Sequence, residues 1–363
     1  MKPNIKFWNK KKILITGHTG FKGGWLTVLL NYFGSKVSGY ALDPVGKNNF
    51  YNSVKLSKIL NKDFRKDITN LNLLKKSIKE IQPEIIFHLA AQSSVIESFK
   101  DSKNTVMSNV IGTTNILEAI KEQKSVKCLI IITTDKVYQN YRTRKHFKED
   151  SILGGDDIYS GSKACCEILV NSYRKSFFSN SNCNIATVRA GNCFGGGDWT
   201  KDRIVKDVLE SFFHNKNLIL RNPEATRPWQ HVIEPLIGYL MLAENLSSKE
   251  GKKYSGPWNF GPSSKQNMKV LNLVKLFKEN INASSNIIIK KKDNRFQNKK
   301  FKVFESKYLN INSKKAFNKI KWKPKLTIKQ SIRLTVEWYN CFKFKKNLLK
   351  LTTQQIKNYL NNN

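Results

Sequence analysis

The first half of the chain alternates short apolar runs with longer segments in which apolar residues recur at helical spacing. The apolar runs predict β-strands at 13–16, 36–43, 84–91 and 126–134. Helical segments lie between them, after a glycine-rich turn at 17–23 and at 71–81 and 104–123. Strands separated by helices of this length predict an α/β fold, in which a doubly wound parallel sheet carries helices on both faces. Ligands of such a sheet bind at the carboxyl ends of its strands.

Beyond about residue 190 the pattern becomes irregular. Gly, Pro, Trp and Asn gather in the segments AGNCFGGGDW, RNPEATRPWQH and GPWNFGPSS. This composition predicts a smaller mixed lobe that closes over the sheet and binds substrate. We expect a dinucleotide-binding domain at 1–188 to which segments near 230–258 and 308–335 return, a substrate-binding lobe at 189–229 and 259–307, and a helical tail at 336–363. The basic run at 286–304 is predicted to be a solvated loop or an edge strand.

The net charge of +37 raises the question of a nucleic-acid partner, because a basic surface attracts phosphate. Only about ten of the 64 basic residues are Arg, and the Lys residues scatter along the whole length. Phosphate-reading surfaces favour clustered Arg, so we predict no nucleic-acid partner. The sequence lacks a run of about 18 apolar residues and a signal peptide, so no membrane partner is expected. The six cysteines form no CxxC pair or zinc-type cluster, which predicts reduced thiols, no metal site and a cytoplasmic location.

A glycine triplet marks the turn after the first predicted strand. Gly17, Gly20 and Gly23 stand in GHTGFKG, directly before a predicted helix. Glycine suits these positions because a Cβ would block the tight turn and the approach of backbone N–H groups to a pyrophosphate. Asp43 ends the second predicted strand, where a carboxylate accepts from ribose hydroxyls and repels a 2′-phosphate, which favours NAD over NADP. The candidates for the adenine pocket of this Rossmann-type domain follow the next strand: Asp67 and Ile68.

Polar residues end the strand predicted at 126–134. The run IITTDKVY follows aliphatic residues with Thr133, Thr134, Asp135 and Lys136. Such side chains cost desolvation at a strand end unless they are hydrogen-bonded or used in chemistry. Further along, YSGSK places Tyr159 and Lys163 four residues apart, so on a helix both project from one face. A free phenol has a pKa of about 10. A fixed ammonium nearby lowers this pKa, so we expect Tyr159 to be a usable base at neutral pH.

Together these motifs resemble a known family. The chain is similar to the extended short-chain dehydrogenase/reductases, the NAD-dependent epimerases and dehydratases, and more narrowly to the CDP-glucose 4,6-dehydratases. The matching segments run from near the N-terminus to the last residues: GHTGFKGGW, GYALDP, IIFHLAAQ, SNVIGTTNILEAI, TTDKVY, YSGSK, VRAGNCFGGGDWTKDR, RNPEATRPWQHVIEPLIGY, WNFGP and LTTQQIKNYL. GGGDW and RPWQH are more selective for this dehydratase than the glycine turn, which marks only the superfamily.

The resemblance implies a hydro-lyase reaction that leaves NAD as it began. Tyr159 would take the proton of the sugar 4-hydroxyl while the C4 hydride passes to NAD, with Thr134 hydrogen-bonded to the same oxygen. A base would then remove the acidic C5 proton of the 4-ketone, Asp135 as general acid would protonate the departing 6-hydroxyl, and the hydride would return to C6. CDP-glucose would become CDP-4-keto-6-deoxyglucose. The alternative is a 4,6-dehydratase or 4-epimerase of another nucleotide sugar, although an epimerase needs no acid beside the 6-hydroxyl.

The role of Lys136 stays open between two hypotheses. Related dehydratases commonly carry Glu at this position, and an ammonium cannot accept a proton. As the C5 base, Lys136 must be neutral, which burial and a nearby nicotinamide cation favour by lowering its pKa. In the other role, Lys136 stabilises the enolate as a cation while a different group removes the proton.

The resemblance also assigns contacts to cofactor and substrate. Besides the glycines and acids named above, it places around NAD the residues Phe21, Ala90, Ala91, Tyr159 and Lys163. Around the nucleotide sugar it places Gln92, Asn192, Arg189 and Arg227. The guanidinium fork of Arg227 would clamp phosphate, whereas Arg189 could equally be structural. A dimer or tetramer packed through helices of the dinucleotide domain is implied, as are deoxy sugars of bacterial surface polysaccharide as the end products.

Two stretches depart from the family pattern. SSVIESF places Ile96 where an arginine is expected, and DDIYS carries no proline ahead of Tyr159. Both flank the expected sugar and nicotinamide pocket, so they leave the sugar, and to a lesser degree the nucleotide, open.

Overall fold

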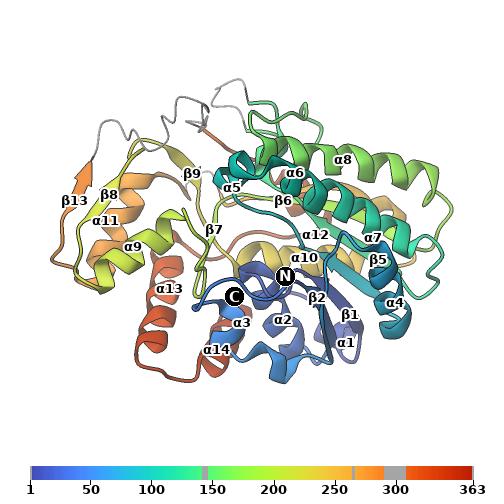
Figure 1. Ribbon diagram of the computed structural model, residues 1–363, viewed down its shortest axis with the longest axis horizontal. Coiled ribbons are helices and arrows are strands. Elements are labelled where there is room, and N and C mark those ends of the chain that lie inside the picture. Colours follow the sequence, from blue (N-terminus) through green and yellow to red (C-terminus); the bar gives the residue numbers. More distant parts are fainter. Residues whose placement is uncertain (1, 141–145, 264–265, 290–307, 362–363) are drawn as a thin grey trace.

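The computed structural model describes residues 2–140, 146–263, 266–289 and 308–361, and Figure 1 shows a larger lobe beside a smaller one. The larger lobe holds a seven-stranded sheet of order β11-β6-β5-β4-β1-β2-β3. Its strands are β1 (Lys12–Thr16), β2 (Lys36–Ala41), β3 (Lys62–Arg65), β4 (Ile85–His88), β5 (Cys128–Ile132), β6 (Asn184–Ala190) and β11 (Gly256–Phe260). Every neighbouring pair is parallel, which confirms the predicted doubly wound α/β fold.

Strand β1 shows why helices cover both faces of this sheet. Successive side chains of a strand point to opposite faces. Ile13 and Ile15 accordingly join one apolar core, while Leu14 joins another. Because both faces are apolar, each must be buried by helices.

The helices divide between the two faces (Figure 1). One core is built with α4 (Leu71–Ile81), α7 (Gly112–Ile120) and α8 (Ile158–Ser176), and the other with α2 (Phe21–Tyr32) and α10 (Ile233–Leu246). The segment predicted as a helix at 104–123 is interrupted by a π-helical turn, Met107–Ile111, between α6 (Ser102–Val106) and α7. The remaining short helices of this lobe are α1 (Ile5–Trp8), α3 (Phe50–Ser53) and α5 (Val95–Lys100).

The smaller lobe is built from short strand pairs and two helices. β7 (Cys193–Phe194) pairs with β10 (Gln230–His231), β8 (Leu218–Leu220) with β13 (Ile287–Ile289), and β9 (Thr226–Pro228) with β12 (Asn267–Lys269). The helices are α9 (Ile204–Phe213) and α11 (Val270–Ile281). The predicted basic run at 286–304 includes β13, and its residues from 290 onward lie outside the described part of the chain.

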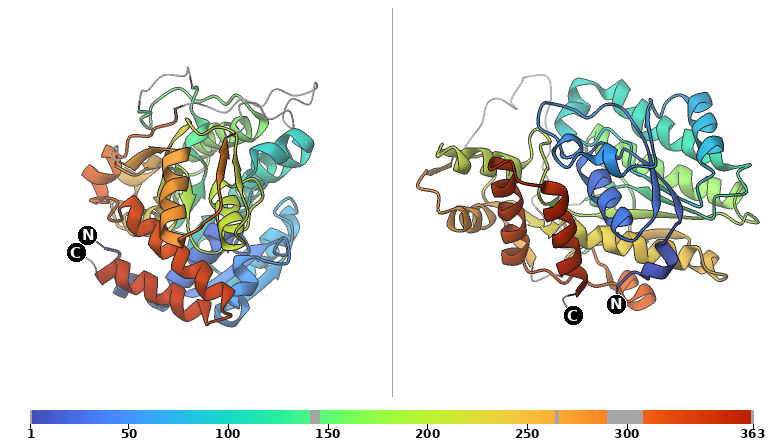
Figure 2. Two further views of the ribbon diagram at one scale, coloured as in Figure 1. Left: turned by 90° about the vertical axis from the view of Figure 1, so that its left-hand side faces the viewer. Right: turned by 90° about the horizontal axis from the view of Figure 1, so that it is seen from below.

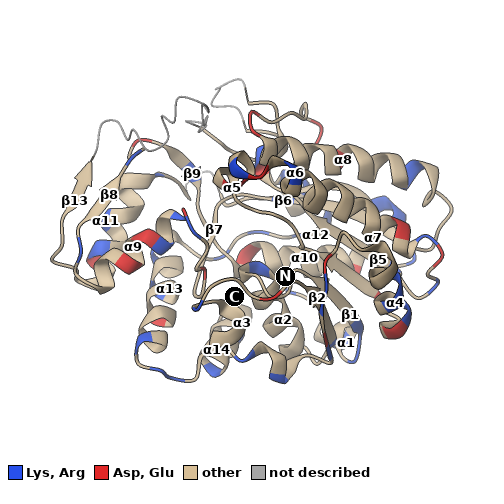
Figure 3. Cartoon of the chain, viewed as in Figure 1, with Lys and Arg blue, Asp and Glu red and all other residues tan. Residues whose placement is uncertain are grey.

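The C-terminal segment returns to the larger lobe. α12 (Lys314–Ile320) packs against α10 and β11, and α13 (Ile328–Lys343) pairs with α14 (Leu348–Asn361), which contacts α2 (Figure 2). Within the described ranges, no helix is long and apolar enough to cross a membrane. Lys and Arg lie on helices and loops of both lobes in the view of Figure 3.

Candidate active site

The polar end of β5 forms a compact turn. Asp135 opens a short 3₁₀ turn, Asp135–Val137, which Thr134 caps. The Thr134 hydroxyl lies 3.3 Å from the backbone nitrogen of Lys136 and donates to Oδ1 of Asp135 at 3.1 Å. Thr134 and Asp135 are buried, with 7% and 3% of their surfaces exposed. The strand-end residues are therefore held in a fixed arrangement at the carboxyl edge of the sheet.

Thr133 turns away from this group into a buried ionic cluster. Its hydroxyl donates to Glu167 of α8 at 2.5 Å. The same carboxylate pairs with Arg189 of β6, whose Nη2 lies 2.8 Å from Oε2, while Nη1 of Arg189 donates to the Tyr138 hydroxyl at 2.8 Å. Arg189 is 2% exposed. All of its nitrogens bond to the protein, so its predicted contact with substrate is replaced by the structural role that the sequence left open.

Helix α8 brings Tyr159 and Lys163 to the end of β5. The Asp157 side chain caps the helix by accepting from the Ser160 backbone N–H at 2.9 Å. Tyr159 hydrogen-bonds the Thr134 hydroxyl. Nζ of Lys163 donates to the carbonyl oxygen of Ile132 at 3.2 Å. The predicted pair thus lies on one helix face, beside the predicted strand-end residues.

The ionisation of Tyr159 differs from the sequence-based expectation. Burial raises the pKa of Tyr159 above that of an ordinary phenol, and Arg203 and the hydrogen bond from Thr134 only partly oppose this. Burial also lowers the pKa of Lys163, whose Nζ donates to the Ile132 carbonyl. The expectation that a nearby ammonium lowers the pKa of Tyr159 was wrong for this structure, because desolvation is the largest effect on the phenol.

Burial acts in opposite directions on Asp135 and Lys136. It raises the pKa of the Asp135 carboxyl, against the lowering effects of Lys136, Thr134, Lys22 and Arg227. It lowers the pKa of the Lys136 ammonium, against the raising effects of Asp135 and Asp157. Desolvation disfavours the charged form of either group, so both shifts favour a protonated acid beside a neutral amine.

The site contains two cations that sequence reasoning missed. Lys22 lies in the first turn of α2 and interacts with Asp135, Lys163 and the thiol of Cys193. Arg203, the cap of α9, acts on Tyr159 and Lys136, and its Nη2 lies 3.5 Å from the Ser93 carbonyl. The only sequence signals were the positions of these residues inside GHTGFKGGW and GDWTKDR, the segments that carry the family resemblance.

Residues of the smaller lobe also lie near Asp135 and Lys136. Arg227 of β9 is 5% exposed and acts on both Asp135 and Lys136. The backbone carbonyl of Asn192 accepts from Gln230 at 3.1 Å, which fixes the loop between β6 and β7.

The Gln92 amide of the larger lobe donates to Ser94 and Thr105 at 3.0 and 2.9 Å, so in this structure it holds its own loop instead of facing substrate.

The glycine turn fits a bound dinucleotide. Gly17 has φ +74°, and a Cβ there would lie 2.7 Å from the backbone nitrogen of Ala90; one at Gly23 would lie 2.3 Å from the Gly17 carbonyl oxygen. Only glycine allows both approaches. Gly20 caps α2 without a side-chain hydrogen bond, an arrangement that suits a helix N-terminus whose N–H groups bind an anion. Phe21 begins this helix, and Ala90 and Ala91 follow β4 at the same edge.

The acids predicted for the adenosine half lie beyond β2 and β3. Asp43 is exposed just after β2, and its Oδ1 lies 3.8 Å from Nε of Arg65. Asp67 follows β3 and accepts from the Thr69 N–H at 2.8 Å. Ile68 is buried, and its carbonyl accepts from Asn115 at 3.0 Å. These positions continue the same sheet edge away from Tyr159.

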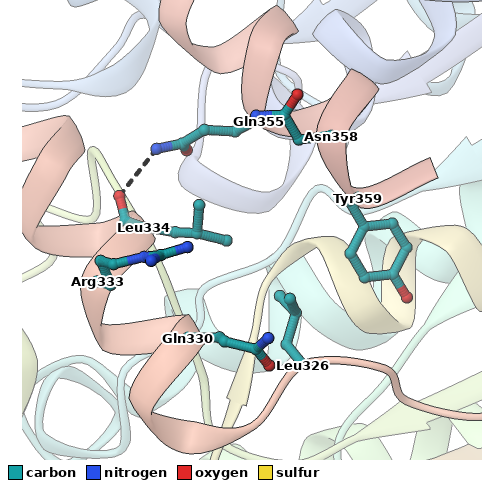
Figure 4. A pocket seen from close by; sticks show the side chains of 7 residues that line it. All are labelled: Leu326, Gln330, Arg333, Leu334, Gln355, Asn358 and Tyr359. Carbon is teal, nitrogen blue, oxygen red and sulfur yellow. Dashed lines mark hydrogen bonds between the residues drawn. The ribbon is translucent and has the colours of Figure 1, made fainter. Parts of the chain in front are cut away.

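A separate pocket of about 230 Å³ lies between α13 and α14 (Figure 4). Figure 4 shows Gln355 donating to the Leu334 carbonyl, a hydrogen bond of 2.9 Å. None of the predicted site residues lines this pocket.

Comparison with known proteins agrees with this geometry. The family model described as GDP-mannose 4,6 dehydratase matches residues 14–335. A CDP-glucose 4,6-dehydratase of Salmonella typhimurium is 36% identical over 98% of this chain and 97% of its own length. Among solved structures, a dTDP-glucose 4,6-dehydratase of Bacillus anthracis in complex with NAD has a TM-score of 0.75 at 23% identity, covering 93% of this chain and 99% of that one. A UDP-glucose 4-epimerase of Thermotoga maritima has a TM-score of 0.76 at 20% identity, covering 90% and 98%. The chain therefore belongs to the GDP-mannose 4,6 dehydratase family, within the extended short-chain dehydrogenase/reductases.

Proposed function

We propose that the protein catalyses the NAD-dependent dehydration of CDP-glucose to CDP-4-keto-6-deoxyglucose. The observation that carries the proposal is the contact of Thr134 with both Asp135 and Tyr159. This contact joins the Tyr159 and Lys163 pair of α8, which serves C4 oxidation, to the acid and the amine at the end of β5. The identity of 36% to a CDP-glucose 4,6-dehydratase supports the nucleotide and the sugar.

The first step is proton removal from the sugar 4-hydroxyl by Tyr159. The glycine turn and the first N–H groups of α2 would hold NAD, which would supply a hydride acceptor for C4 and a hydride donor for C6. Thr134 donates to the 4-oxygen and to Asp135 in turn, and Arg203 stabilises the phenolate form of Tyr159, which accepts this proton and becomes a neutral phenol. Lys163, anchored on the Ile132 carbonyl, positions the pair.

Elimination of water needs an acid at the 6-hydroxyl and a base at C5. Asp135 serves as the acid, because burial keeps its carboxyl protonated to a higher pH than an ordinary aspartate. Lys136 is the nearest candidate for the base, because burial favours its neutral form. Arg227, buried in β9 beside both residues, holds the phosphate of the nucleotide.

A nucleotide-sugar 4-epimerase is the rival function that the fold allows. Such an enzyme would use the Tyr159 and Lys163 pair in the same way. It has no need for a buried carboxyl and a buried amine at the end of β5. In this protein the burial of both groups costs desolvation free energy. The pair therefore favours dehydration.

The test is mass spectrometry of the purified protein incubated with NAD and, separately, with CDP-, dTDP-, UDP- and GDP-linked hexoses. One sample carries CDP-glucose deuterated at C4. We expect loss of one water from the CDP sugar alone, with the deuterium recovered at C6.

Two other outcomes would overturn parts of the proposal. Water loss from a different nucleotide sugar would keep the chemistry and replace the substrate. A change of configuration at C4 without a change of mass would make the protein an epimerase. The matched control is Asp135→Asn, which should form the 4-ketone and lose no water.

A further inference from the structure

A buried polar cluster lies behind the carboxyl of Asp135. Oδ1 of Asp135 accepts from Thr134, but Oδ2 makes no hydrogen bond to the residues that the structure describes. A Cβ on Gly191 would lie 3.1 Å from this Oδ2, so the loop after β6 passes directly over it. A buried carboxylate oxygen without a partner is costly, so a group that compensates it is expected nearby.

The first turn of α2 brings a cation that acts on this carboxyl. Lys22 is the second residue of the helix and acts on Asp135, while its ammonium hydrogen-bonds the thiol of Cys193. The thiol in turn donates to the Gly191 carbonyl at 3.0 Å. Lys22 and Cys193 thus lie with the Gly191 loop beside the oxygen of Asp135 that Thr134 does not use.

The other groups that face Asp135 come from four elements. On its own turn lies Lys136, on β9 lies Arg227, and on α10 lies Tyr239, whose buried hydroxyl makes no hydrogen bond within the described ranges. Tyr159 of α8 also acts on Asp135. Of the three cations, Lys136 is assigned to the C5 chemistry and Arg227 to phosphate. Lys22 is the cation with no role in the proposed reaction.

We propose that Lys22 is a positioning residue of the dehydration site, whose ammonium faces Asp135 from the cofactor helix and sets how readily that carboxyl gives up its proton. The inference rests on the proposed role of Asp135 as the acid. Burial alone would make Asp135 a weak acid that holds its proton too firmly. A general acid works best when its pKa is close to the working pH, and a neighbouring ammonium brings it there.

The test measures the ionisation of Asp135 directly in the full-length protein without substrate. Infrared difference spectra between each protein and its Asp135→Asn derivative isolate the carboxyl band, which is followed over a pH series. In Lys22→Met we expect the midpoint of Asp135 to move upward by about one pH unit, because an opposing charge is lost. Lys22→Arg should restore it, and Lys36→Met, at the exposed start of β2, should leave it unchanged.

The pH profile of water loss provides the second readout. The alkaline limb of the elimination rate should move upward in Lys22→Met by the same amount as the infrared midpoint. An unchanged midpoint in folded Lys22→Met would overturn the inference about Lys22. If Asp135→Asn itself eliminates water at the normal rate, the role of Asp135 as acid fails, whatever the Lys22 variants show.

Discussion

Asp135 and Lys136 are neighbours in sequence, yet burial moves their ionisation in opposite directions. A protonated carboxyl and a neutral amine carry no net charge, so the pair avoids the cost of two buried ions. These are also the protonation states that elimination needs, an acid for the 6-hydroxyl and a base for C5. At the scale of single residues, the desolvation that shifts both pKa values therefore also prepares the site for the reaction.

Substitutions that change the charge at position 136 can distinguish the two roles of Lys136, C5 base or cation that stabilises the enolate. Lys136→Glu supplies a group that accepts a proton but carries the wrong charge for an enolate, whereas Lys136→Met supplies neither. If Lys136 is the C5 base, we expect Glu to retain at least tenfold more elimination than Met. Single-turnover mass spectrometry of water loss, with solvent deuterium exchange at C5, measures both steps.

The opposite order would identify Lys136 as a cation. In that case Lys136→Glu would be slower than Lys136→Met, because a carboxylate repels the enolate. Formation of the 4-ketone is the internal control, since Tyr159 performs that step and neither substitution touches it.

At the scale of elements, the junction of β1 and α2 depends on two missing side chains. A Cβ at Gly23 would lie 2.3 Å from the Gly17 carbonyl oxygen, so Gly23→Ala must displace the turn that receives the cofactor. We expect NAD to bind at least tenfold more weakly, a loss of about 1.4 kcal/mol or more, as titration calorimetry would detect.

A second glycine provides the matched control. Gly161 lies between Tyr159 and Lys163 on α8, and a Cβ there meets nothing within 4 Å. Gly161→Ala should bind NAD normally and gain about 0.5–1 kcal/mol of stability from the stiffer helix. Equal loss of NAD binding in both variants would contradict the steric account.

The C-terminal helices are attached to α10 through one buried carboxyl. Glu234 accepts from the backbone N–H groups of Lys325 and Leu326 at 2.8 and 2.6 Å and from the Tyr359 hydroxyl at 2.5 Å. Burial raises the pKa of Glu234 from 4.5 to about 7. A carboxyl that binds its proton more tightly in the folded state contributes stability below its unfolded pKa, and this stability is lost as the pH rises to the folded value.

We therefore expect the free energy of unfolding to fall as the pH rises from about 5 to about 7, by roughly 3 kcal/mol at most. Glu234→Gln should abolish most of this decline. Urea unfolding of both proteins over the pH series measures it, and Glu250→Gln, at an exposed ion pair with Lys253, is the control. An identical decline in Glu234→Gln would assign the pH dependence to other groups.

The elements were more predictable than the chemistry between them. The helix at 71–81 forms as predicted, because its apolar spacing and the Asn70 cap are local signals. The strand predicted at 84–91 ends at His88, since Leu89–Ala91 leave the sheet for the cofactor edge. Lys22 was missed because a lysine inside a glycine turn resembles a solvated residue. The predicted direction of the pKa shift of Tyr159 was wrong, because the burial of this residue depends on residues distant in the sequence.

At the scale of the whole molecule, the site is completed by both lobes. The larger lobe supplies the acid, the amine and the pair on α8, while Arg203 and Arg227 come from segments of the smaller lobe. The overall charge of +37 adds a positive field that attracts an anionic nucleotide sugar to the molecule.

The exposed apolar residues of α8 and its neighbours support the expected self-association. Ile168 is 55% exposed on α8, and Met107 and Ile111 are 39% and 36% exposed on the π-helical turn that packs beside it. Neighbouring apolar side chains in contact with water indicate a surface that another molecule covers. A dimer packed through these helices would bury them on both copies, close to the helix that carries Tyr159.

Ile168→Glu places a charge on the exposed face of α8. We expect it to weaken the dimer by at least tenfold, because an unpaired carboxylate would be buried there. Sedimentation velocity over a concentration series measures the change. Phe344→Glu, at a 65% exposed position after α13, is the matched control and should leave the mass unchanged. If Ile168→Glu keeps the mass of the parent protein while Phe344→Glu dissociates it, the copies associate through the C-terminal helices, and α8 faces water.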